Sequence, residues 1–490
     1  MKQILAEAPL LEQCLIESGT LSLKDYCCQM AKKARDVTME LAPSEDVREA
    51  VSDYLVPLVG NELAKKAAVQ VYEQKLLLTA NHHEAEFCVQ SLQGNMLYAY
   101  VLDKMGYEEG IVPIFSNTTV NMSNENFPRG MLLYKTNTQM ERLPVFPFRE
   151  RNSLVAEAAG FTEEMVNQTK KTVERYILNG TLEEKTGLII KEILTKIYLE
   201  KSILKNPRYA IQAFHINRKL GNCIYRDRKK EFLYIELEEI TKRLLYRDLK
   251  GEEGLTEKIL FCKPYQENLT AQLDGKTGCW DTQRKKGTWM FWGIDSRKRR
   301  FSMMLKQQDK KEFLEGVDME GNVYSYEYTK KNILLLLEQR KLLPGLFLSF
   351  FELYFLRSYT MAGGCFQSLY LKDMCEGLCY TLETIGGHNR EIEILRQKKC
   401  HYLSGPMFLL EYQNVINEGK KEKRAYPLGM VELMEQEGIS WQDFCGKLDI
   451  TMEQAHIIGI YNFYPDLLPK SKQSENWYQE LSLEFAQLFL

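Results

Sequence analysis

The sequence predicts an α/β protein with a parallel-sheet core, extensive helical additions and a β-hairpin-rich insertion. A strand, a helix and a second strand follow one another between residues 76 and 117, as LLLTA, FCVQSLQGNMLYAYVLDKMG and IVPIFSN. A unit of this kind is normally right-handed and belongs to a parallel sheet. Between residues 258 and 328, apolar segments such as GTWMFWGID and NVYSYEY alternate with turns rich in Gly, Asp and Lys, which is typical of hairpins.

The chain divides into six segments by predicted content. A length of 490 residues exceeds what one hydrophobic core supports, so two or three structural units are expected. The predicted segments are an N-terminal helical segment (1–75), the first half of the α/β core (76–150), a helical segment (151–254), the β-rich insertion (255–335), the second half of the core (336–405) and a C-terminal helical segment (406–490). The second half includes a long apolar helix near residues 342–356, with a kink at Pro344.

Composition and charge narrow the class of protein. The net charge of −3 gives no general attraction to nucleic acid or to an anionic membrane. The N-terminus carries Glu7 and Glu12 where a signal peptide needs an unbroken apolar stretch. The twelve cysteines include no CxxC pair, which favours free thiols in a reducing compartment. We therefore expect a soluble cytoplasmic protein without a membrane partner; the sequence leaves its oligomeric state open.

The first candidate site is the polar turn Asn81-His82-His83-Glu84, which follows the first strand. Ligands of open parallel sheets bind beyond the carboxyl ends of the strands, and imidazole titrates near neutral pH. His82 and His83 are therefore the predicted acid/base residues. Glu86, Gln90 and Gln93 are spaced four and three residues apart, so they form one polar stripe on the following helix. Asn81, Gln90, Gln93 and Asn95 are predicted to bind the substrate, unless the turn only caps the helix and the stripe is solvated.

Two further segments are expected to converge on the same place. The loop after the second strand contains Asn117, Asn121 and Arg129, and a guanidinium commonly holds a carboxylate or phosphate. Asn side chains also form turns by themselves, and a solvated Arg129 is the alternative. The third segment is a glycine turn followed by a helix, where the backbone can approach a ligand closely. Its predicted substrate-binding residues are Gly363, Gly364, Gln367 and Tyr370.

Two alternative functions use other features of the chain. A metal-assisted hydrolase would need His82 and His83 as ligands. Adjacent residues of an extended backbone point to opposite sides, however, and no HExxH spacing is present, so no metal site is predicted. A non-catalytic module would bind nucleic acid or protein through the basic Trp-rich hairpin that ends in Arg297, Lys298, Arg299 and Arg300. This run and the earlier one, Arg284-Lys285-Lys286, both fall at predicted hairpin turns, where charged side chains are normally solvated. Nucleic acid is therefore not expected as a partner.

Three motifs together resemble the bacillithiol-pathway cysteine-adding enzymes. They are LLLTANHHEAEFCVQSLQGN, VPIFSNTTVNMSNENFPRG and YTMAGGCFQSLYLKDM, in this order. The resemblance covers about a quarter of the chain. It implies a Rossmann-like core similar to nucleotidylyl transferases, with helical additions, and condensation of cysteine with an amino-sugar conjugate. It leaves a nucleotide open as the cofactor. The chain departs from the family at Asn81-His82-His83-Glu84, where the family has a Gly/Gln/Pro-type turn, and in its Asn-rich loop.

The sequence as a whole favours an enzyme that acts on a small polar metabolite, an amine-condensing ligase or transferase of a biosynthetic reaction. Fold kinship alone does not fix the reaction or the substrate.

Overall fold

The computed structural model describes residues 9–34, 39–108, 110–124, 127–136, 140–251, 254–398, 400–403, 405–417 and 420–456. Residues 1–8 and 457–490, which belong to the predicted terminal helical segments, lie outside this range.

Five parallel strands form the central sheet, in the order β13-β12-β1-β2-β5. The strands are β1 (Leu76–Leu78), β2 (Ile111–Ser116), β5 (Glu231–Glu236), β12 (Thr360–Gly363) and β13 (Cys400–Tyr402). Counted along the chain, the order is 3-2-1-4-5, the doubly wound arrangement of a Rossmann-like fold, so the predicted fold class is confirmed. The order reverses between β1 and β12, and a ligand site is expected at the carboxyl ends of these two strands.

The two faces of the sheet bury separate hydrophobic cores. Leu76 and Leu78 enter one core, and Leu77 between them enters the other. Both faces are covered, which is why these strands are continuous apolar runs in the sequence. The first face packs against α3 (Leu23–Lys33), α6 (Val89–Lys104) and most of α10 (Tyr209–Gly221). The second face packs against α4 (Glu45–Val59), α5 (Asn61–Gln74), α11 (Leu237–Lys250) and α16 (Cys365–Ile385).

The first half of the core is not confined to residues 76–150. The segment β3 (Gly130–Leu133) pairs only with β4 (Glu141–Pro144), in an antiparallel ribbon outside the central sheet. The third strand of this half is instead β5, because Ile111 to Ser116 pair residue by residue with Glu231 to Glu236. The intervening helices are η2 (Phe148–Asn152), α7 (Glu163–Leu178), α8 (Glu184–Ile193), η3 (Leu194–Tyr198), α9 (Lys201–Leu204) and α10.

The predicted β-rich insertion begins with helices. Residues that include KILFCKPY form α12 (Leu255–Phe261) and α13 (Lys263–Leu273), and Pro264 occupies the first turn of α13, where a missing N–H costs nothing. The prediction of a strand there is wrong. The strands that follow are β6 (Phe291–Ile294), β7 (Arg300–Phe301), β8 (Met303–Gln308), β9 (Lys311–Val317) and β10 (Val323–Glu327), and α14 (Lys330–Glu338) comes after them.

The long apolar helix predicted near residues 342–356 is confirmed only from residue 346 onward. Its first part is the strand β11 (Leu342–Pro344), which pairs antiparallel with β6. Gly345 then caps the short helix α15 (Leu346–Phe350), which continues as the π-helical turn η4 (Phe351–Leu356). Proline at the end of an edge strand loses no ladder hydrogen bond that the sheet needs.

The C-terminal segment is only partly helical where it is described. β14 (Leu410–Asn417) and β15 (Lys420–Pro427) form an antiparallel hairpin. The described helices of this segment are α18 (Met430–Glu435), α19 (Trp441–Gly446) and η5 (Lys447–Asp449). Two further helices lie elsewhere in the chain: α2 (Pro9–Ser18) and α17 (Asn389–Arg396). Within the described ranges, no helix combines the length and the apolar character that crossing a membrane requires.

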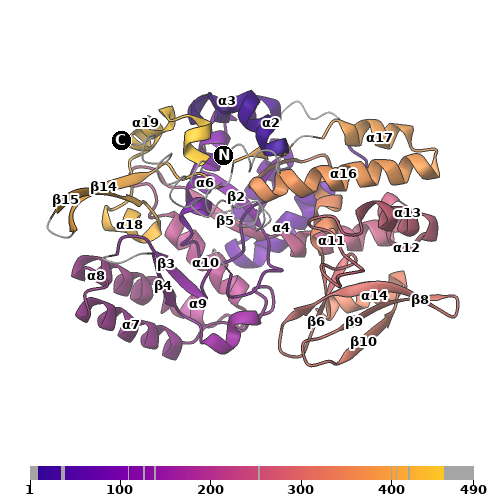
Figure 1. Cartoon of the computed structure of the whole chain (residues 1–490), viewed down its shortest axis with the longest axis horizontal. Helices are drawn as coiled ribbons and strands as arrows, with labels where there is room; N and C mark the ends of the chain where they lie inside the picture. Colours follow the sequence, from indigo (N-terminus) through magenta and orange to yellow (C-terminus); the bar gives the residue numbers. More distant parts are fainter. Residues whose placement is uncertain are drawn as a thin grey trace.

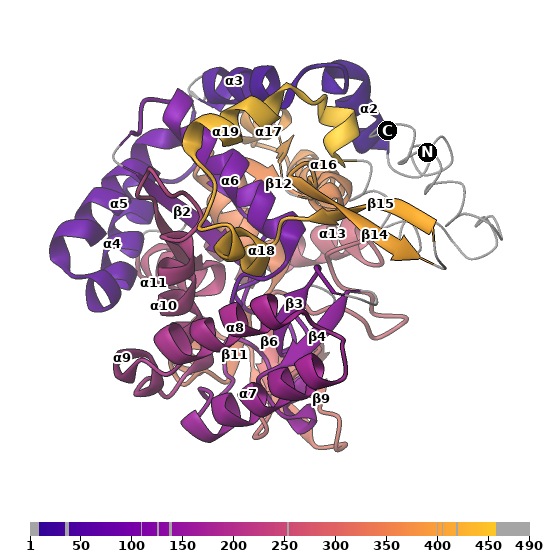
Figure 2. The same cartoon turned by 90° about the vertical axis from the view of Figure 1, so that its left-hand side faces the viewer.

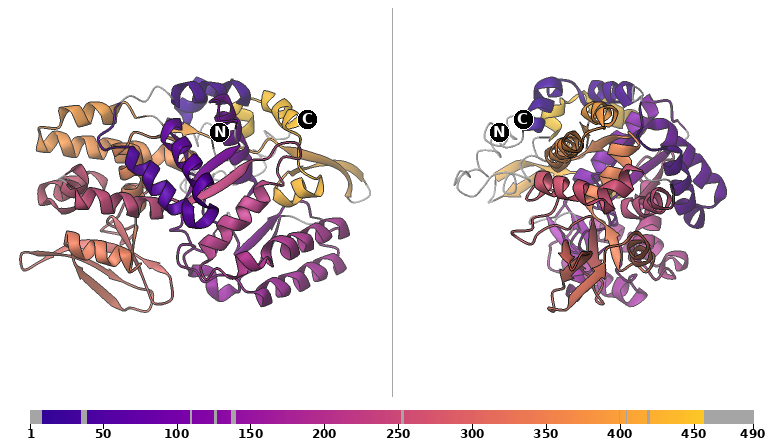
Figure 3. Two further views of the ribbon diagram at one scale, coloured as in Figure 1. Left: turned by 180° about the vertical axis from the view of Figure 1, so that it is seen from behind. Right: turned by 90° about the vertical axis from the view of Figure 1, so that its right-hand side faces the viewer.

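The additions surround the sheet on several sides. Figure 1 shows the hairpin β14–β15 at one end of the molecule and the sheet β8–β10 at the other. Figure 2 shows α4 and α5 together at one side of the molecule, and α7 below α8 and β3. The view from behind shows the insertion and the α7–α8 pair as separate projections (Figure 3).

Gly363 is the last residue of β12, and a substitution there tests how tightly side chains pack at the switch point, where the strand order reverses between β1 and β12. A Cβ atom at this position would lie 1.8 Å from Gln367 Oε1. We expect Gly363→Ala to displace that side chain and to lower the free energy of unfolding by about 1–3 kcal/mol. Gly446→Ala is the control, because its Cβ would meet nothing within 4 Å. Urea unfolding of both variants measures the two free energies of unfolding. Equal values for the two variants would show that the Gln367 side chain moves away from the added Cβ at no cost.

Candidate functional site

The structure brings the predicted segments together at the carboxyl ends of β1, β2 and β12. Gln367, in the first turn of α16, donates to the carbonyl oxygen of Thr79 at 2.9 Å, and Thr79 Oγ1 donates to Gln367 Oε1 at 3.1 Å. Beyond Thr79, the backbone of Asn117 donates to Asn81 O and accepts from His83 N. Three segments far apart in the sequence therefore meet at the switch point of the sheet.

His83 has a structural position, which removes it from the predicted acid/base residues. Its side chain is fully buried, Nδ1 lies 2.7 Å from Ser116 Oγ, and Nε2 lies 3.0 Å from the carbonyl oxygen of Ala210. Both ring nitrogens are thus engaged with the sheet and with α10. Burial also lowers the pKa of His83, so the ring is neutral at pH 7.

His82 points to the other side of the chain. Its side chain is 30% exposed, and Nδ1 lies 4.0 Å from Glu84 Oε2. Burial lowers the pKa of His82 to about 4. A neutral ring with so low a pKa exchanges protons poorly near pH 7, although it can still form a hydrogen bond with a ligand.

The loop before α6 holds two carboxylates inside the protein. The helix begins at Val89, so Glu86 precedes it and the predicted stripe on the first two turns is wrong. The loop is fixed by α10: Asn217 Oδ1 accepts from Glu86 N, Asn217 Nδ2 donates to Glu84 O, and Tyr209 OH accepts from Ala85 N. These bonds satisfy the buried backbone groups of the loop and turn both acids inward.

Glu86 lies in a cage of neutral donors between the sheet and α6. Its Oε2 accepts from Asn81 Nδ2 at 3.0 Å, from Asn95 Nδ2 at 3.1 Å and from the Tyr234 hydroxyl at 3.1 Å. The side chain is 6% exposed. Burial raises the pKa of Glu86 to about 7, even though these three hydrogen bonds favour the ionised form. We call Glu86, Asn81, Asn95 and Tyr234 the Glu86 site.

Unpaired polar atoms occur on the two amides that contact this carboxylate and on Gln90 of α6. A carboxylate only accepts hydrogen bonds, so Asn81 and Asn95 must turn their nitrogens toward it. Their carbonyl oxygens then have no hydrogen-bond partner, and neither has Gln90 Nε2 in the first turn of α6. Asn81 and Asn95 are fully buried, and buried amides normally have every such atom paired. Two buried acceptors and one buried donor therefore lack a hydrogen-bond partner within the part of the protein that the structure describes.

Several other predicted site residues are committed to the fold. Gln93 uses its whole amide on the backbone of Phe408, Leu409 and Leu428. The Asn117 side chain accepts from Thr119, and Asn121 forms a backbone bridge with Leu154.

Arg129 and Tyr370 do not reach the Glu86 site either. Arg129 donates to Phe146 O and lies over the Phe148 ring. Tyr370 packs against Phe350 in the opposite core. Gly363 leaves room for Gln367, and Gly364 precedes α16 as its N-cap, so both glycines position this turn.

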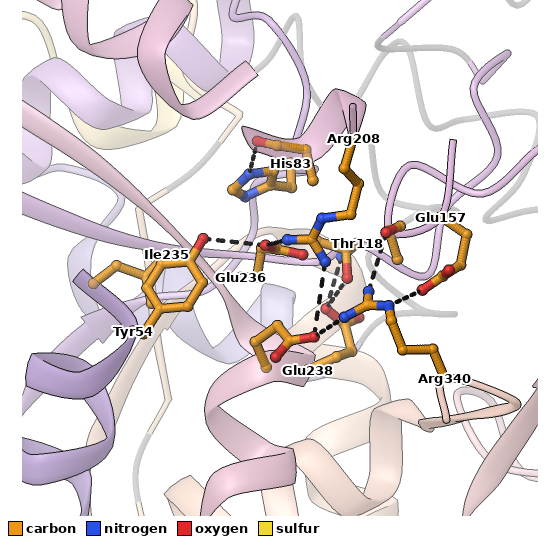
Figure 4. Close-up of polar contacts among 12 residues, drawn as sticks. Tyr54, His83, Thr118, Glu157, Arg208, Ile235, Glu236, Glu238 and Arg340 are labelled. Carbon is orange, nitrogen blue, oxygen red and sulfur yellow. Dashed lines mark hydrogen bonds and ion pairs between the residues drawn. The ribbon is translucent and has the colours of Figure 1, made fainter. Parts of the chain in front are cut away.

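A network of ion pairs holds the neighbouring strand ends. Glu236, at the end of β5, pairs with Arg208, which precedes α10 (Figure 4). Arg340 reaches Glu157 at 2.6 Å and Glu239 at 2.5 Å. Burial opposes the ionisation of Glu239, but Lys242 and Arg340 hold its pKa well below its usual range. We call Arg208, Glu236, Glu239, Arg340 and Glu157 the strand-end ion network.

The alternative function of a metal-assisted hydrolase needs a cluster of ligand side chains that includes His82 and His83. Among the residues that the structure describes, the one group with metal-binding spacing is Asp295, Asp318 and Glu320, which contains no histidine. Arg299 already pairs with two of these acids.

The basic hairpin is occupied by contacts within the chain. Arg297 pairs with Glu320, and Lys298 pairs with Glu157. Arg300 donates to Thr119 O and lies over Trp292. Its charges are therefore compensated by the protein itself.

No family model, curated protein or solved structure matches the chain. The resemblance to the bacillithiol-pathway enzymes therefore stays an expectation from short motifs.

The sequence analysis did not single out Asn217 and Tyr234. It named Glu84 within the polar turn but gave it no role, and it placed Glu86 only on a helical stripe. The sequence does carry a signal for Glu84 and Glu86. Only Ala85 separates them in NHHEAEF, a short polar stretch between two strongly apolar segments. Nothing in the sequence indicates that Asn217 and Tyr234 lie beside them.

The pKa of Glu86 has a measurable consequence for stability. Its folded value of about 7 exceeds the unfolded value of about 4.3, so unfolding releases a proton between these pH values. Stability contributed by this group is present at low pH and is lost as the pH rises to 7. We expect the free energy of unfolding of Glu86→Gln, taken relative to that of the wild type, to increase by about 3 kcal/mol as the pH rises from 4.5 to 8. Urea unfolding over this pH series measures it; a constant difference would contradict the raised pKa.

Proposed function

We propose that the chain is an enzyme that acts on a small polar metabolite at the carboxyl ends of β1 and β12, and that Glu86 exchanges a proton with the substrate. The observation that carries the proposal is the Glu86 site itself. Burying a carboxylate costs free energy, and this one is held by three neutral donors, with no cation paired to it in the described part of the chain. Its pKa near neutral pH is the value that an acid/base catalyst needs.

The open atoms beside Glu86 favour a substrate with an amino group. The free carbonyl oxygens of Asn81 and Asn95 accept hydrogen bonds, as an amine or ammonium group would require. Gln90 Nε2 supplies a donor for a carbonyl or carboxylate oxygen of the same ligand. An acceptor-rich site with one donor suits an amine-bearing metabolite better than a phosphate.

A condensation or group transfer onto an amine follows from this arrangement. The amine attacks as the free base, and its nitrogen loses one proton as the bond to the acyl or other electrophilic carbon forms and the bond to the leaving group breaks. Glu86 as a carboxylate takes that proton, and as the acid it returns the proton to the leaving group. In this proposal His82, which is neutral and partly exposed, hydrogen-bonds the substrate and does not transfer the proton.

The test compares turnover by matched variants. Purified protein is incubated with a pool of amines and acyl donors drawn from polar metabolites, and mass spectrometry follows their consumption. We expect Glu86→Gln to lower turnover by about 10²–10⁴-fold, because the amide cannot accept the proton. Asn81→Ala and Asn95→Ala should weaken substrate binding, with a higher KM.

Two controls separate the site from the rest of the protein. Glu73→Gln removes an exposed carboxylate of α5 and should leave turnover unchanged. The double variant Arg297→Ser, Lys298→Ser should also be nearly silent, because both side chains are more than half exposed. Full turnover by a folded Glu86→Gln, or its loss in the hairpin variant alone, would overturn the proposal.

A further inference from the structure

A cavity of about 710 Å³ lies beside the edge strand β13, away from the Glu86 site. Its walls come from α2, α3, η4, α16 and residues 395–402, and none of its lining residues belongs to the Glu86 site. Figure 1 shows α2 lying near α16 at this part of the molecule. Cavities that bind metabolites and cofactors have volumes of about 300–1,000 Å³, so this one has the size of a ligand site.

Lys398 is the most deeply placed cation of the cavity wall. Its Nζ donates to Ser358 Oγ at 2.5 Å, and no carboxylate within the described part of the chain forms an ion pair with it. An ammonium that leaves water without an anionic partner is costly. Burial accordingly lowers the pKa of Lys398 to about 7, so much of this side chain is the free amine at neutral pH.

The backbone next to Lys398 is held in an uncommon conformation. Ser358 is 2% exposed and has a φ of 56°, in the left-handed region that a residue with a side chain rarely adopts. Its hydroxyl donates to Met39 O, which fixes the oxygen that Lys398 contacts. Tyr354 of the π-helical turn η4 also lines the cavity. Such features persist where the surroundings hold them and are frequent at ligand sites.

The charges of the wall favour an anion. Lys372 has Glu376 at 3.8 Å, and Arg396 has Glu383 as its partner. Lys33 and Lys398 have no such acid within the described ranges. The apolar part of the wall includes Leu371 and Leu395. Glu17 also lines the wall at an exposed position of α2, and Glu40 favours the charged form of Lys398. The cavity therefore combines two lysines that form no ion pair with a described residue with apolar surface, and a bound anion would favour the charged form of Lys398.

We propose that this cavity is a second ligand site, which binds an organic anion of metabolite size through Lys398 and Lys33. A phosphate and a carboxylate present the same chemistry to these two cations. The proposal is independent of the Glu86 site, since the two share no residue.

Pyridoxal 5′-phosphate is a suitable probe, because its phosphate meets the cations while its aldehyde reports on Lys398. The neutral amine attacks the aldehyde carbon, water leaves, and borohydride then reduces the imine to a stable secondary amine. Peptide mapping after digestion locates the label. We expect about one label per chain, at Lys398, at probe concentrations at least tenfold below those that modify surface lysines.

Four variants test this assignment. Lys398→Met should lose the label, and Lys33→Met should require several-fold more probe. Lys372→Met, at a cation that already has an acid beside it, should be labelled like the wild type. Glu86→Gln should also be labelled normally, so failure of the catalytic proposal would not be mistaken for failure of this one.

Competition identifies the kind of anion. Inorganic pyrophosphate that protects Lys398 at millimolar concentration, with citrate inactive, supports a phosphate ligand; the reverse supports a polycarboxylate. Label spread evenly over surface lysines would overturn the proposal. Label at Lys398 that neither anion reduces would overturn it too, because the lysine would then be reactive without an anion site.

Discussion

The loop that carries the candidate site depends on a buried ion pair at the end of β5. Glu236 is fully buried, and Arg208 neutralises it from the residue before α10. A buried charge that loses its partner costs several kcal/mol, so this pair fixes where α10 starts. From that position α10 presents Tyr209 and Asn217 to the backbone of residues 84–86. The orientation of Glu86 is thus set by an ion pair that it does not touch.

The insertion contributes to the same framework from outside the sheet. Arg340, which follows α14, bonds to Glu157, Glu239 and the carbonyl oxygen of Ala156. Lys298 O accepts from Leu154 N, and Arg300 donates to Thr119 O. The basic hairpin therefore forms hydrogen bonds with the loops that follow β2 and helps to hold them in place. Of the four cations at this turn, Lys298 and Arg300 contact the loops that follow β2, whereas Arg297 and Arg299 pair with acids of the insertion itself.

The fold was predictable wherever the signal was local. The unit β1–α6–β2 lies within one stretch of the sequence, and its apolar runs identify strands that are covered on both faces. β5 falls inside the segment predicted to be helical (151–254). About 115 residues separate it from β2, and pairing over such a distance leaves no local mark in the sequence. The start of α6 was misplaced for a related reason. Asn217 and Tyr209, far along the chain, hold residues 84–86 out of the helix.

The site itself was predictable in place but not in its key residue. The turn after β1 lies at the switch point, as parallel-sheet geometry requires. The histidines drew attention by their ordinary pKa, yet the fold gives both rings lower values. Sequence cannot rank Glu86 above them, because its pKa is created by burial and by partners from three separate elements.

Two carboxylates near these strand ends are driven in opposite directions by their neighbours. Glu239 has cations beside it, which keep it ionised. Glu86 is equally removed from water, but its partners are two amides and a phenol, which satisfy its oxygen without supplying positive charge. An arginine in place of Asn95 would stabilise the loop more strongly and would also abolish the capacity to bind a proton near pH 7. A purely structural acid has no need of the weaker arrangement. The neutral cage thus argues for proton exchange at Glu86, because it gives up stability and keeps a group whose two protonation states are both accessible.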